Sequence, residues 1–314
     1  MKEVKDNSID LICTSPPFAL LRKKSYGNVS SHEYVEWFLQ FAREFQRILK
    51  PEGSLVIDIG GTWIKGMPVR SLYHYELVLE LCKPVDEGGC GFYLSQELYW
   101  YNPAKLPTPA EWVTVRRIRV KDAVNTVWWL SLSPTPKANN RRVLKPYSDA
   151  QQVLMKNGYK AKLRPSEHQI STKFGTDNGG AIPPNILSDS EFKYEIGESL
   201  PVNVVSASNT SSNDHYQRQC REHGIKPHPA RFPNQLPEFI INLCTEEGDI
   251  VLDPFAGSNT TGSVAERLQR KWLAFELSEE YLKGSKFRFE SQTPAKVSIE
   301  NKKNGSNGQE KFLF

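Results

Sequence analysis

Patterns that mark several common protein classes are missing from this chain of 314 residues. The 5 cysteines are an odd number, with no C-x-x-C pair and no spacing typical of zinc ligands. We therefore expect free thiols in a reducing cytosol, no metal site and a cytoplasmic protein. No apolar run approaches membrane-spanning length, and the first residues lack the apolar core of a signal peptide, so no membrane partner is expected.

A large excess of charge is also missing. The chain has 40 Lys and Arg against 36 Asp and Glu, and this net charge of +4 does not by itself indicate a nucleic-acid partner. The distribution is uneven, because residues 112–173 hold 13 Lys or Arg against 3 Asp or Glu. Such a concentration favours contact with a phosphate backbone, although a solvated basic face explains it equally well.

Short apolar runs alternate with helix-like periodicity, which is typical of an α/β protein with a parallel sheet. Ser30 to Glu33 form a capping-box pattern before a predicted helix that Lys-Pro-Glu-Gly at 50–53 should stop. The other expected elements are a helix over 260–268 and strands over 9–13, 54–59, 92–99, 126–131, 250–253 and 272–276.

The region between about Ser133 and Gly224 has a different character, with frequent prolines, clusters of Asn and Ser, and little periodicity. A compact domain rarely contains so long an irregular stretch without a function. We expect an inserted recognition lobe, and a disordered linker is the alternative.

Two short loops carry the strongest chemical signal, because each follows a strand-like run, and open α/β sheets bind ligands at such strand ends. Thr14-Ser15-Pro16-Pro17-Phe18 offers proline-fixed carbonyls, a hydroxyl and an aromatic ring, which suit a flat amine. Asp253 to Thr260, Asp-Pro-Phe-Ala-Gly-Ser-Asn-Thr, offers a carboxylate, a glycine and small polar residues, which suit a nucleoside-like cofactor. The second loop is not G-x-G-x-x-G and lacks the lysine of a phosphate-binding loop.

Together the two loops resemble those of DNA methyltransferases that modify amino groups with S-adenosylmethionine (AdoMet), in the permuted, beta-type motif order. In that family S-P-P-[FY] typifies action on N4 of cytosine, and [DN]-P-P-[FYW] typifies action on N6 of adenine. Longer segments at 117–129, 177–180 and 228–233 are similar to PvuII-type cytosine-N4 methyltransferases. The resemblance spans most of residues 3–290.

This resemblance implies an α/β fold, with a Rossmann-like mixed sheet, helices on both faces and an inserted DNA-recognition lobe. It divides the chain into a catalytic half over 1–132, a recognition insertion over 133–224, an AdoMet-binding half over 225–292 and a disordered tail over 293–314. It implies a site-specific enzyme that flips a cytosine out of duplex DNA, methylates N4 and acts beside a restriction endonuclease. The oligomeric state is left open.

The resemblance also assigns roles to residues. Ser15, Pro16, Pro17 and Phe18 would be catalytic, with the serine bonding the amine and relaying its proton and the phenylalanine stacking on the base. The cofactor-binding residues would be Asp253, Phe255, Gly257, Ser258, Asn259, Thr260, Glu276, Pro229 and Phe232. The concentration of basic residues, and not the resemblance, gives the candidate DNA contacts, which are Arg116, Arg117, Arg119, Lys121, Arg141 and Arg142, followed by Lys145, Lys160, Lys162 and Arg164.

Three assignments have alternatives in the residues themselves. Glu276 lies at the end of a predicted strand, where an acidic side chain can bind two ribose hydroxyls, or it caps the next helix. His228 receives no proton-transfer role, because a histidine in a proline-rich turn is more often structural. Residues 58–61, Asp-Ile-Gly-Gly, resemble the lining of the target-base pocket, and a tight turn explains the glycines equally well.

Two rival functions stay open. Adenine-N6 methylation needs the same amine geometry. A DNA-binding chain without catalysis is the other rival, because family members usually carry a Gly-Asp segment before the S-P-P-F strand and none precedes it in this sequence. A covalent mechanism of the cytosine-C5 type is not expected, since no Pro-Cys dipeptide is present.

Overall fold

The computed structural model describes residues 1–20, 27–102, 105–159, 161–163, 167, 169–187, 214–231 and 233–290, and it contains the mixed sheet that the sequence predicts. Its 7 strands lie in the order β7-β3-β4-β2-β1-β8-β9. They are β1 (Ile9–Thr14), β2 (Leu49–Ile59), β3 (Tyr93–Tyr101), β4 (Val124–Ser131), β7 (Ile186–Leu187), β8 (Ile250–Asp253) and β9 (Lys271–Ala274). The β2, β1, β8 and β9 strands run parallel, whereas β4 is antiparallel to both β2 and β3.

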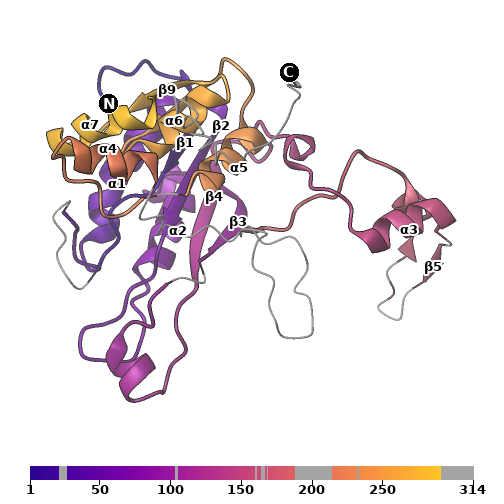
Figure 1. Cartoon of the computed structure of the whole chain (residues 1–314), viewed down its shortest axis with the longest axis horizontal. Coiled ribbons are helices and arrows are strands. Elements are labelled where there is room, and N and C mark those ends of the chain that lie inside the picture. The colour runs from indigo at the N-terminus through magenta and orange to yellow at the C-terminus, as the bar shows by residue number, and fades with distance from the viewer. Residues whose placement is uncertain are drawn as a thin grey trace, which may run out of the picture.

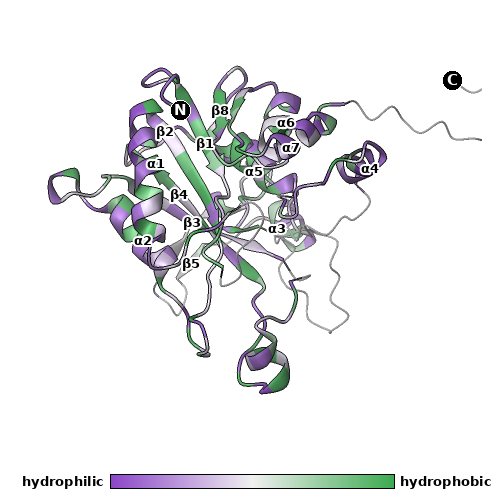
Figure 2. Ribbon diagram, turned by 90° about the vertical axis from the view of Figure 1, so that its left-hand side faces the viewer, coloured by the Kyte–Doolittle hydropathy of each residue, from purple (hydrophilic) through white to green (hydrophobic). Residues whose placement is uncertain are grey.

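Helices cover both faces of the sheet, as predicted (Figure 1). On one face lie α1 (Tyr34–Ile48) and α2 (Tyr73–Cys82), and on the other lie α5 (Gln235–Cys244) and α6 (Thr260–Arg267). Within β1, Ile12 packs into the first core, and Leu11 and Cys13 pack into the second. Burial on both faces explains why the central strands are apolar along their length, as Figure 2 shows for β1.

Two local predictions at the start of the chain are wrong. No side chain caps α1, whose N-cap residue is Glu33, because the hydroxyl of Ser30 donates to the Glu33 carboxylate at 2.7 Å. The strand after α1 begins at Leu49, so residues 50–53 lie inside β2. The extra residues form an irregularity, since Ile9 pairs with Leu49 while Leu11 already pairs with Ser54.

The region 133–224 contributes elements both to a projecting unit and to the main body. Figure 1 shows α3 (Asp149–Asn157) and β5 (Lys162–Leu163) standing apart from the sheet, and β5 pairs with β6 (Gln169–Ile170). In contrast, β7 pairs with β3 in the main sheet, and α4 (His215–Glu222) packs against the segment after β9 through a cluster that contains Phe287. The division of the chain into domains stays a prediction.

The remaining elements are short. They are α7 (Glu279–Ser285) and the helical turns η1 (Val85–Glu87), η2 (Glu111–Val115), η3 (Asn140–Val143), η4 (Thr172–Gly175) and η5 (Lys286–Arg288). Across the described ranges, no helix is long and apolar enough to cross a membrane.

Candidate active site

A large cleft opens at the carboxyl ends of β1, β2 and β8, where the two predicted loops meet. Its volume is about 1670 Å³, which exceeds the roughly 300–1,000 Å³ of a pocket for one small ligand. The loop between β3 and β4 borders the same cleft, because β4 starts and β3 ends at this edge of the sheet. The cleft therefore has room for two ligands side by side.

The two motif loops are bonded directly to each other. The hydroxyl of Thr14 donates to Oδ1 of Asp253 at 2.7 Å, and the hydroxyl of Thr261 donates to Oδ2 at 2.8 Å. The backbone N–H of Phe255 donates to Oδ1 at 3.1 Å. Burial raises the pKa of Asp253 to about 6, and these three donors oppose the rise. The carboxylate of Asp253 thus holds β1, β8 and α6 together at the cleft.

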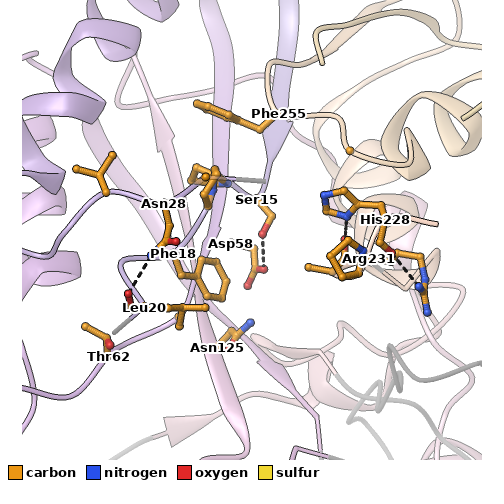
Figure 3. A pocket seen from close by; sticks show the side chains of 18 of the residues that line it. Ser15, Phe18, Leu20, Asn28, Asp58, Thr62, Asn125, His228, Arg231 and Phe255 are labelled. Carbon is orange, nitrogen blue, oxygen red and sulfur yellow. Dashed lines mark hydrogen bonds between the residues drawn. The ribbon is translucent and has the colours of Figure 1, made fainter. Parts of the chain in front are cut away.

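Ser15 forms a hydrogen-bonded pair with a second buried carboxylate, as Figure 3 shows. Its hydroxyl donates to Oδ2 of Asp58 at 3.0 Å. Burial raises the pKa of Asp58 to about 6, against the opposing effects of Ser15, Asn125 and Lys105. Within the described residues, Oδ1 of Asp58 has no hydrogen-bond partner. Since buried polar atoms are normally bonded, this unpaired oxygen marks the Ser15–Asp58 pair as a candidate for a functional role.

The ring of Phe18 lies directly on the backbone of Gly60. A Cβ atom at position 60 would stand 2.6 Å from Cε2 of Phe18, so only glycine permits this contact. The hydroxyl of Tyr73 donates to the carbonyl of Gly60 and fixes the same turn. Gly60 and Gly61 both line the cleft, which agrees with the base-pocket assignment of residues 58–61.

The other end of the cleft is formed by the loop after β8. Gly257 has φ of 53°, and a Cβ atom there would meet the ring of His228 at 3.2 Å, so glycine serves both the turn and the close approach. Burial lowers the pKa of His228, and its ring packs on Tyr281 with centroids 4.5 Å apart. These contacts agree with a structural role for His228.

Glu276 has features of both of its predicted roles. Its Oε1 accepts from the N–H of Ser278, the N-cap residue of α7, at 2.8 Å. Its Oε2 accepts from the N–H of Gly257, also at 2.8 Å. Because each carboxylate oxygen has two lone pairs, both can still accept from a ligand in the cleft that Glu276 lines. Ribose binding stays a prediction.

An apolar wall stands beside these polar groups. The Phe255 ring packs against Trp37 and Phe41, with centroids 5.7 Å and 5.0 Å apart. Phe275 and Leu277 flank Glu276 in the lining of the cleft, and Leu277 is fully exposed. The sequence pattern identified Phe255 but not Trp37 or Phe41, whose helical spacing also suits ordinary core residues.

Most of the predicted cofactor residues that the structure describes line the cleft, and Asn259 does not. Pro229, Ser258 and Thr260 lie in the lining. In contrast, Asn259 is not among the described residues that line it, because its side chain is the N-cap of α6 and accepts from the N–H of Gly262 at 3.1 Å. Phe232 lies outside the described residues.

The loop between β3 and β4 carries four of the ten predicted DNA contacts, in a stretch flanked by the lining residues Glu111 and Asp122. Arg116 lies over Trp112 at 5.0 Å and bonds Glu111, a lining residue, at 2.7 Å. Arg119 donates to the carbonyl of Pro68 at 3.1 Å. Arg117 and Lys121 belong to the same exposed stretch. Their position agrees with contact to a substrate that enters the cleft.

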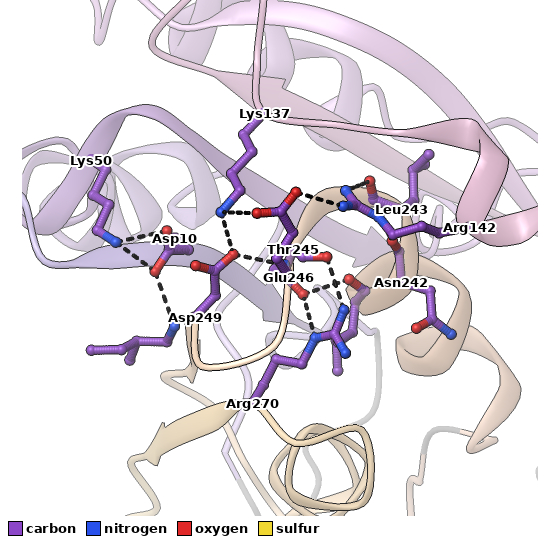
Figure 4. A network of polar contacts seen from close by, with 12 residues as sticks. Asp10, Lys50, Lys137, Arg142, Asn242, Leu243, Thr245, Glu246, Asp249 and Arg270 are labelled. Carbon is purple, nitrogen blue, oxygen red and sulfur yellow. Dashed lines mark hydrogen bonds and ion pairs between the residues drawn. The ribbon is translucent and has the colours of Figure 1, made fainter.

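Arg142 occupies a different place, in the network of Figure 4 at the amino ends of the parallel strands. It donates to the carbonyls of Asn242 and Leu243 at 2.8 Å and 3.2 Å, and to Glu246 at 3.0 Å. Those carbonyls end α5, so Arg142 closes that helix. We therefore no longer propose Arg142 as a DNA contact. Its exposed neighbour Arg141 stays a candidate.

The comparisons with known proteins agree with this geometry. Residues 9–287 match the family model N6_N4_Mtase, described as DNA methylase. The type II methyltransferase M.PvuII of Proteus hauseri is 49% identical over 292 residues, which cover 92% of this chain and 80% of that protein. The DNA adenine methyltransferase YhdJ of Escherichia coli (strain K12) is 24% identical over 290 residues, which cover 90% and 76%.

A solved structure is also similar. PvuII DNA methyltransferase (cytosine-N4-specific) superposes with a TM-score of 0.68 and 43% identity, over 93% of this chain and 83% of that one. The chain belongs to the N6/N4 family of DNA methylases.

Proposed function

We propose that this chain transfers a methyl group from AdoMet to N4 of a cytosine flipped out of duplex DNA. The observation that carries the proposal is the Ser15–Asp58 pair, which opens into the same cleft as the loop after β8. The 49% identity to M.PvuII supports it independently. The similar structure is named a cytosine-N4-specific methyltransferase, and we extend that specificity to this chain.

The cofactor end of the cleft fits AdoMet by its chemistry. The apolar wall of Phe255, Trp37 and Phe41 suits a flat, weakly polar ring. Glu276 offers two acceptor oxygens for ribose hydroxyls, and Gly257 allows the backbone to approach closely. AdoMet, when bound, supplies an electrophilic methyl group on its sulfonium. The protein's task is to present the amine to that methyl and to remove one proton.

Ser15 and Asp58 are arranged to do both. The hydrogen of the Ser15 hydroxyl goes to Asp58, so the lone pairs of Ser15 can accept from the amine. Accepting bonds from an amine draw its lone pair out of the conjugated ring and make it a better nucleophile. Because the pKa of Asp58 is about 6, the group is ionised at neutral pH and can take the proton that Ser15 relays.

The fixed backbone and Phe18 hold the base for this step. Pro16 and Pro17 lock φ and donate no hydrogen bond, so the carbonyls of this loop keep their direction. Phe18 is half-buried on Gly60 and presents its ring in the cleft as a stacking surface. Preorganised groups of this kind contribute several kcal/mol when water is excluded.

The cost of extruding the base, a few kcal/mol, has to be offset by contacts to DNA. We infer that Arg116, Arg117, Arg119 and Lys121 supply part of it from the rim of the cleft, and that the projecting unit around α3 supplies more. We also infer that the enzyme works on chromosomal DNA in the cytoplasm beside a restriction endonuclease. The type II names of the relatives support that pairing.

The test is to identify the product. DNA incubated with the chain and AdoMet carrying a labelled methyl group is digested to nucleosides, and the labelled base is identified by mass spectrometry. We expect N4-methylcytosine and no N6-methyladenine, and sequencing of DNA from expressing cells locates the site. Labelled adenine would favour the activity that the name of YhdJ states, and the absence of any label would favour a DNA-binding role without catalysis.

A further inference from the structure

We propose that Lys105 is a specificity-determining residue that donates a hydrogen bond to O2 of the target cytosine. The inference rests on the proposed function and names the group that separates cytosine from adenine. Both bases present an exocyclic amine beside an acceptor ring nitrogen, so Ser15 and Asp58 bond either one. On the far side of that nitrogen cytosine carries the acceptor O2, whereas adenine carries C2–H. A donor placed there favours cytosine.

Lys105 lies in the lining of the cleft, on the loop between β3 and β4, and its charge interacts with that of Asp58. Its Nζ donates to Oδ1 of Asn125 and to the carbonyl of Val124, the latter at 3.2 Å. Asn125 is 4% exposed and also lines the cleft. Burial lowers the pKa of Lys105, and the charge of Asp58 opposes that effect. A half-buried cation therefore stands within the electrostatic field of the carboxylate that takes the proton.

The hydrogen bonds of Lys105 indicate which donors and acceptors Lys105 and Asn125 present to the cleft. An ammonium group has three hydrogens, and within the described chain Nζ has two acceptors, which leaves one hydrogen for a ligand. Because Oδ1 of Asn125 accepts from Lys105, the Asn125 amide nitrogen is turned toward Asp58 (Figure 3). The cleft therefore has an acceptor pair, Ser15 and Asp58, and next to it a donor pair, Asn125 and Lys105.

This arrangement matches one edge of cytosine. The amine lies at the acceptor pair and O2 lies at the donor pair. Adenine would place C2–H against the remaining hydrogen of the Lys105 ammonium and leave that hydrogen without a partner. A site that leaves a buried donor unpaired with the wrong base should lower kcat/KM for that base by a factor of about 10 to 100. This factor lies at the lower end of such effects.

A simpler explanation is that Lys105 only balances the charge of Asp58. The two explanations differ in what they predict for a change in the base. A lysine that only balances charge acts equally on any base at the site. A lysine that bonds O2 loses its effect when that oxygen is replaced by a poorer acceptor.

The experiment compares three enzymes on two bases. Duplexes carry the methylation site found by sequencing, with either cytosine or 2-thiocytosine at the target position. Methyl transfer is measured for the wild-type chain, Lys105→Met and the control Lys271→Met, whose side chain is exposed at the start of β9 on the opposite edge of the sheet. Thermal unfolding confirms that the variants are folded.

We expect kcat/KM of the wild-type chain to fall about 10- to 100-fold on 2-thiocytosine, from loss of one charged hydrogen bond. Lys105→Met should show a similar loss on cytosine and a smaller further loss on 2-thiocytosine than wild type, whereas Lys271→Met should behave as wild type. The larger size of sulfur affects all three enzymes alike, so the ratio between enzymes reports the hydrogen bond.

Equal further losses for Lys105→Met and wild type on 2-thiocytosine would overturn the inference in favour of charge balance. Wild-type activity that is equal on both bases would overturn it without any variant, even if Lys105→Met fails to fold. In either case cytosine is still the base labelled, so the proposed function stands. Labelled adenine in the wild-type reaction would overturn both together.

Discussion

The two ends of the cleft satisfy their polar groups in opposite ways. At the cofactor end, Asp253 accepts three hydrogen bonds from within the chain and Glu276 accepts two from backbone N–H groups. At the base end, the described residues leave Oδ1 of Asp58 buried without a partner. An unpaired buried acceptor costs about 1 to 3 kcal/mol until a ligand pairs it. The carboxylates of the cofactor end are thus fully bonded within the chain, whereas the carboxylate of the base end keeps one unpaired oxygen.

Asp58→Asn should have the largest effect on catalysis, because the substitution removes the proton acceptor but keeps the shape of the side chain. We expect kcat to fall by a factor on the order of 10³, within the range for loss of a general base. AdoMet affinity, measured by calorimetric titration, should change little. A variant that keeps wild-type kcat would exclude Asp58 from proton transfer.

The second largest effect is expected for Ser15→Ala. The rate of methyl transfer should fall by a factor of about 10² or more, as for the loss of one positioned polar group. AdoMet binding should stay nearly intact, because Ser15 bonds Asp58 and not the loop after β8. Thr14→Val is the matched control on the cofactor side, since it removes a bond to Asp253 instead. Comparable activity in Ser15→Ala and wild type would refute the role of the serine.

Glu276→Ala should weaken the binding of AdoMet by about 1 to 3 kcal/mol for each ribose hydrogen bond lost. The control is Ser278→Ala, because Ser278 caps α7 by accepting from the N–H of Tyr281 at 3.4 Å. The control should lower stability by about 1 kcal/mol and leave AdoMet affinity unchanged. If the two variants behave alike in calorimetry, Glu276 has only the capping role.

The ionisation of Asp58 should make both activity and stability depend on pH. Since its pKa is about 6, kcat/KM should fall about tenfold per pH unit below that value. The folded-state pKa is raised, so ionising Asp58 destabilises the fold as pH rises from about 4 to about 6. Asp58→Asn should therefore gain up to about 3 kcal/mol over wild type across that window, measured by denaturant unfolding. A difference that is independent of pH would contradict the buried ionised carboxylate.

The smallest effect is expected from two adjacent arginines. Arg141→Gln should lower the slope of log affinity against log salt by about 1 if that side chain contacts a phosphate. Arg142→Gln should leave the slope unchanged and destabilise the fold, because Arg142 bonds the end of α5. Equal slopes for wild type and both variants would place the DNA away from Arg141.

Much of the fold could be predicted because it depends on local pattern. The strand at Ile250–Asp253 was predicted with its observed bounds, since an apolar run before a loop of small residues has few alternatives. The predicted capping box at Ser30 is wrong because the Ser30 hydroxyl bonds the Glu33 side chain and not a backbone N–H. Side-chain partners of this kind depend on geometry within one turn, which residue types do not specify.

The site shows the same limit over longer distances. Ser15, Phe18 and the loop after β8 could be identified because motif residues are adjacent in sequence. Asn259 could be misplaced because Asn259 and Gly262 form an ordinary N-cap pattern inside the motif. Lys105 gave no signal, since a lone lysine in a loop is usually solvated, and only the antiparallel pairing of β3 with β4 brings it beside Asn125.

By itself, the sequence determined the α/β class, the permuted order of the loops and the chemistry that each loop offers, because those properties depend on neighbouring residues. Only the tertiary structure decided which polar groups are used up within the chain and which face the cleft. Thr14 and Asp253 are 239 positions apart, and Ser15 and Asp58 are 43 apart. The parallel sheet brings these strand ends to one edge, and burial there raises both carboxyl pKa values to about 6.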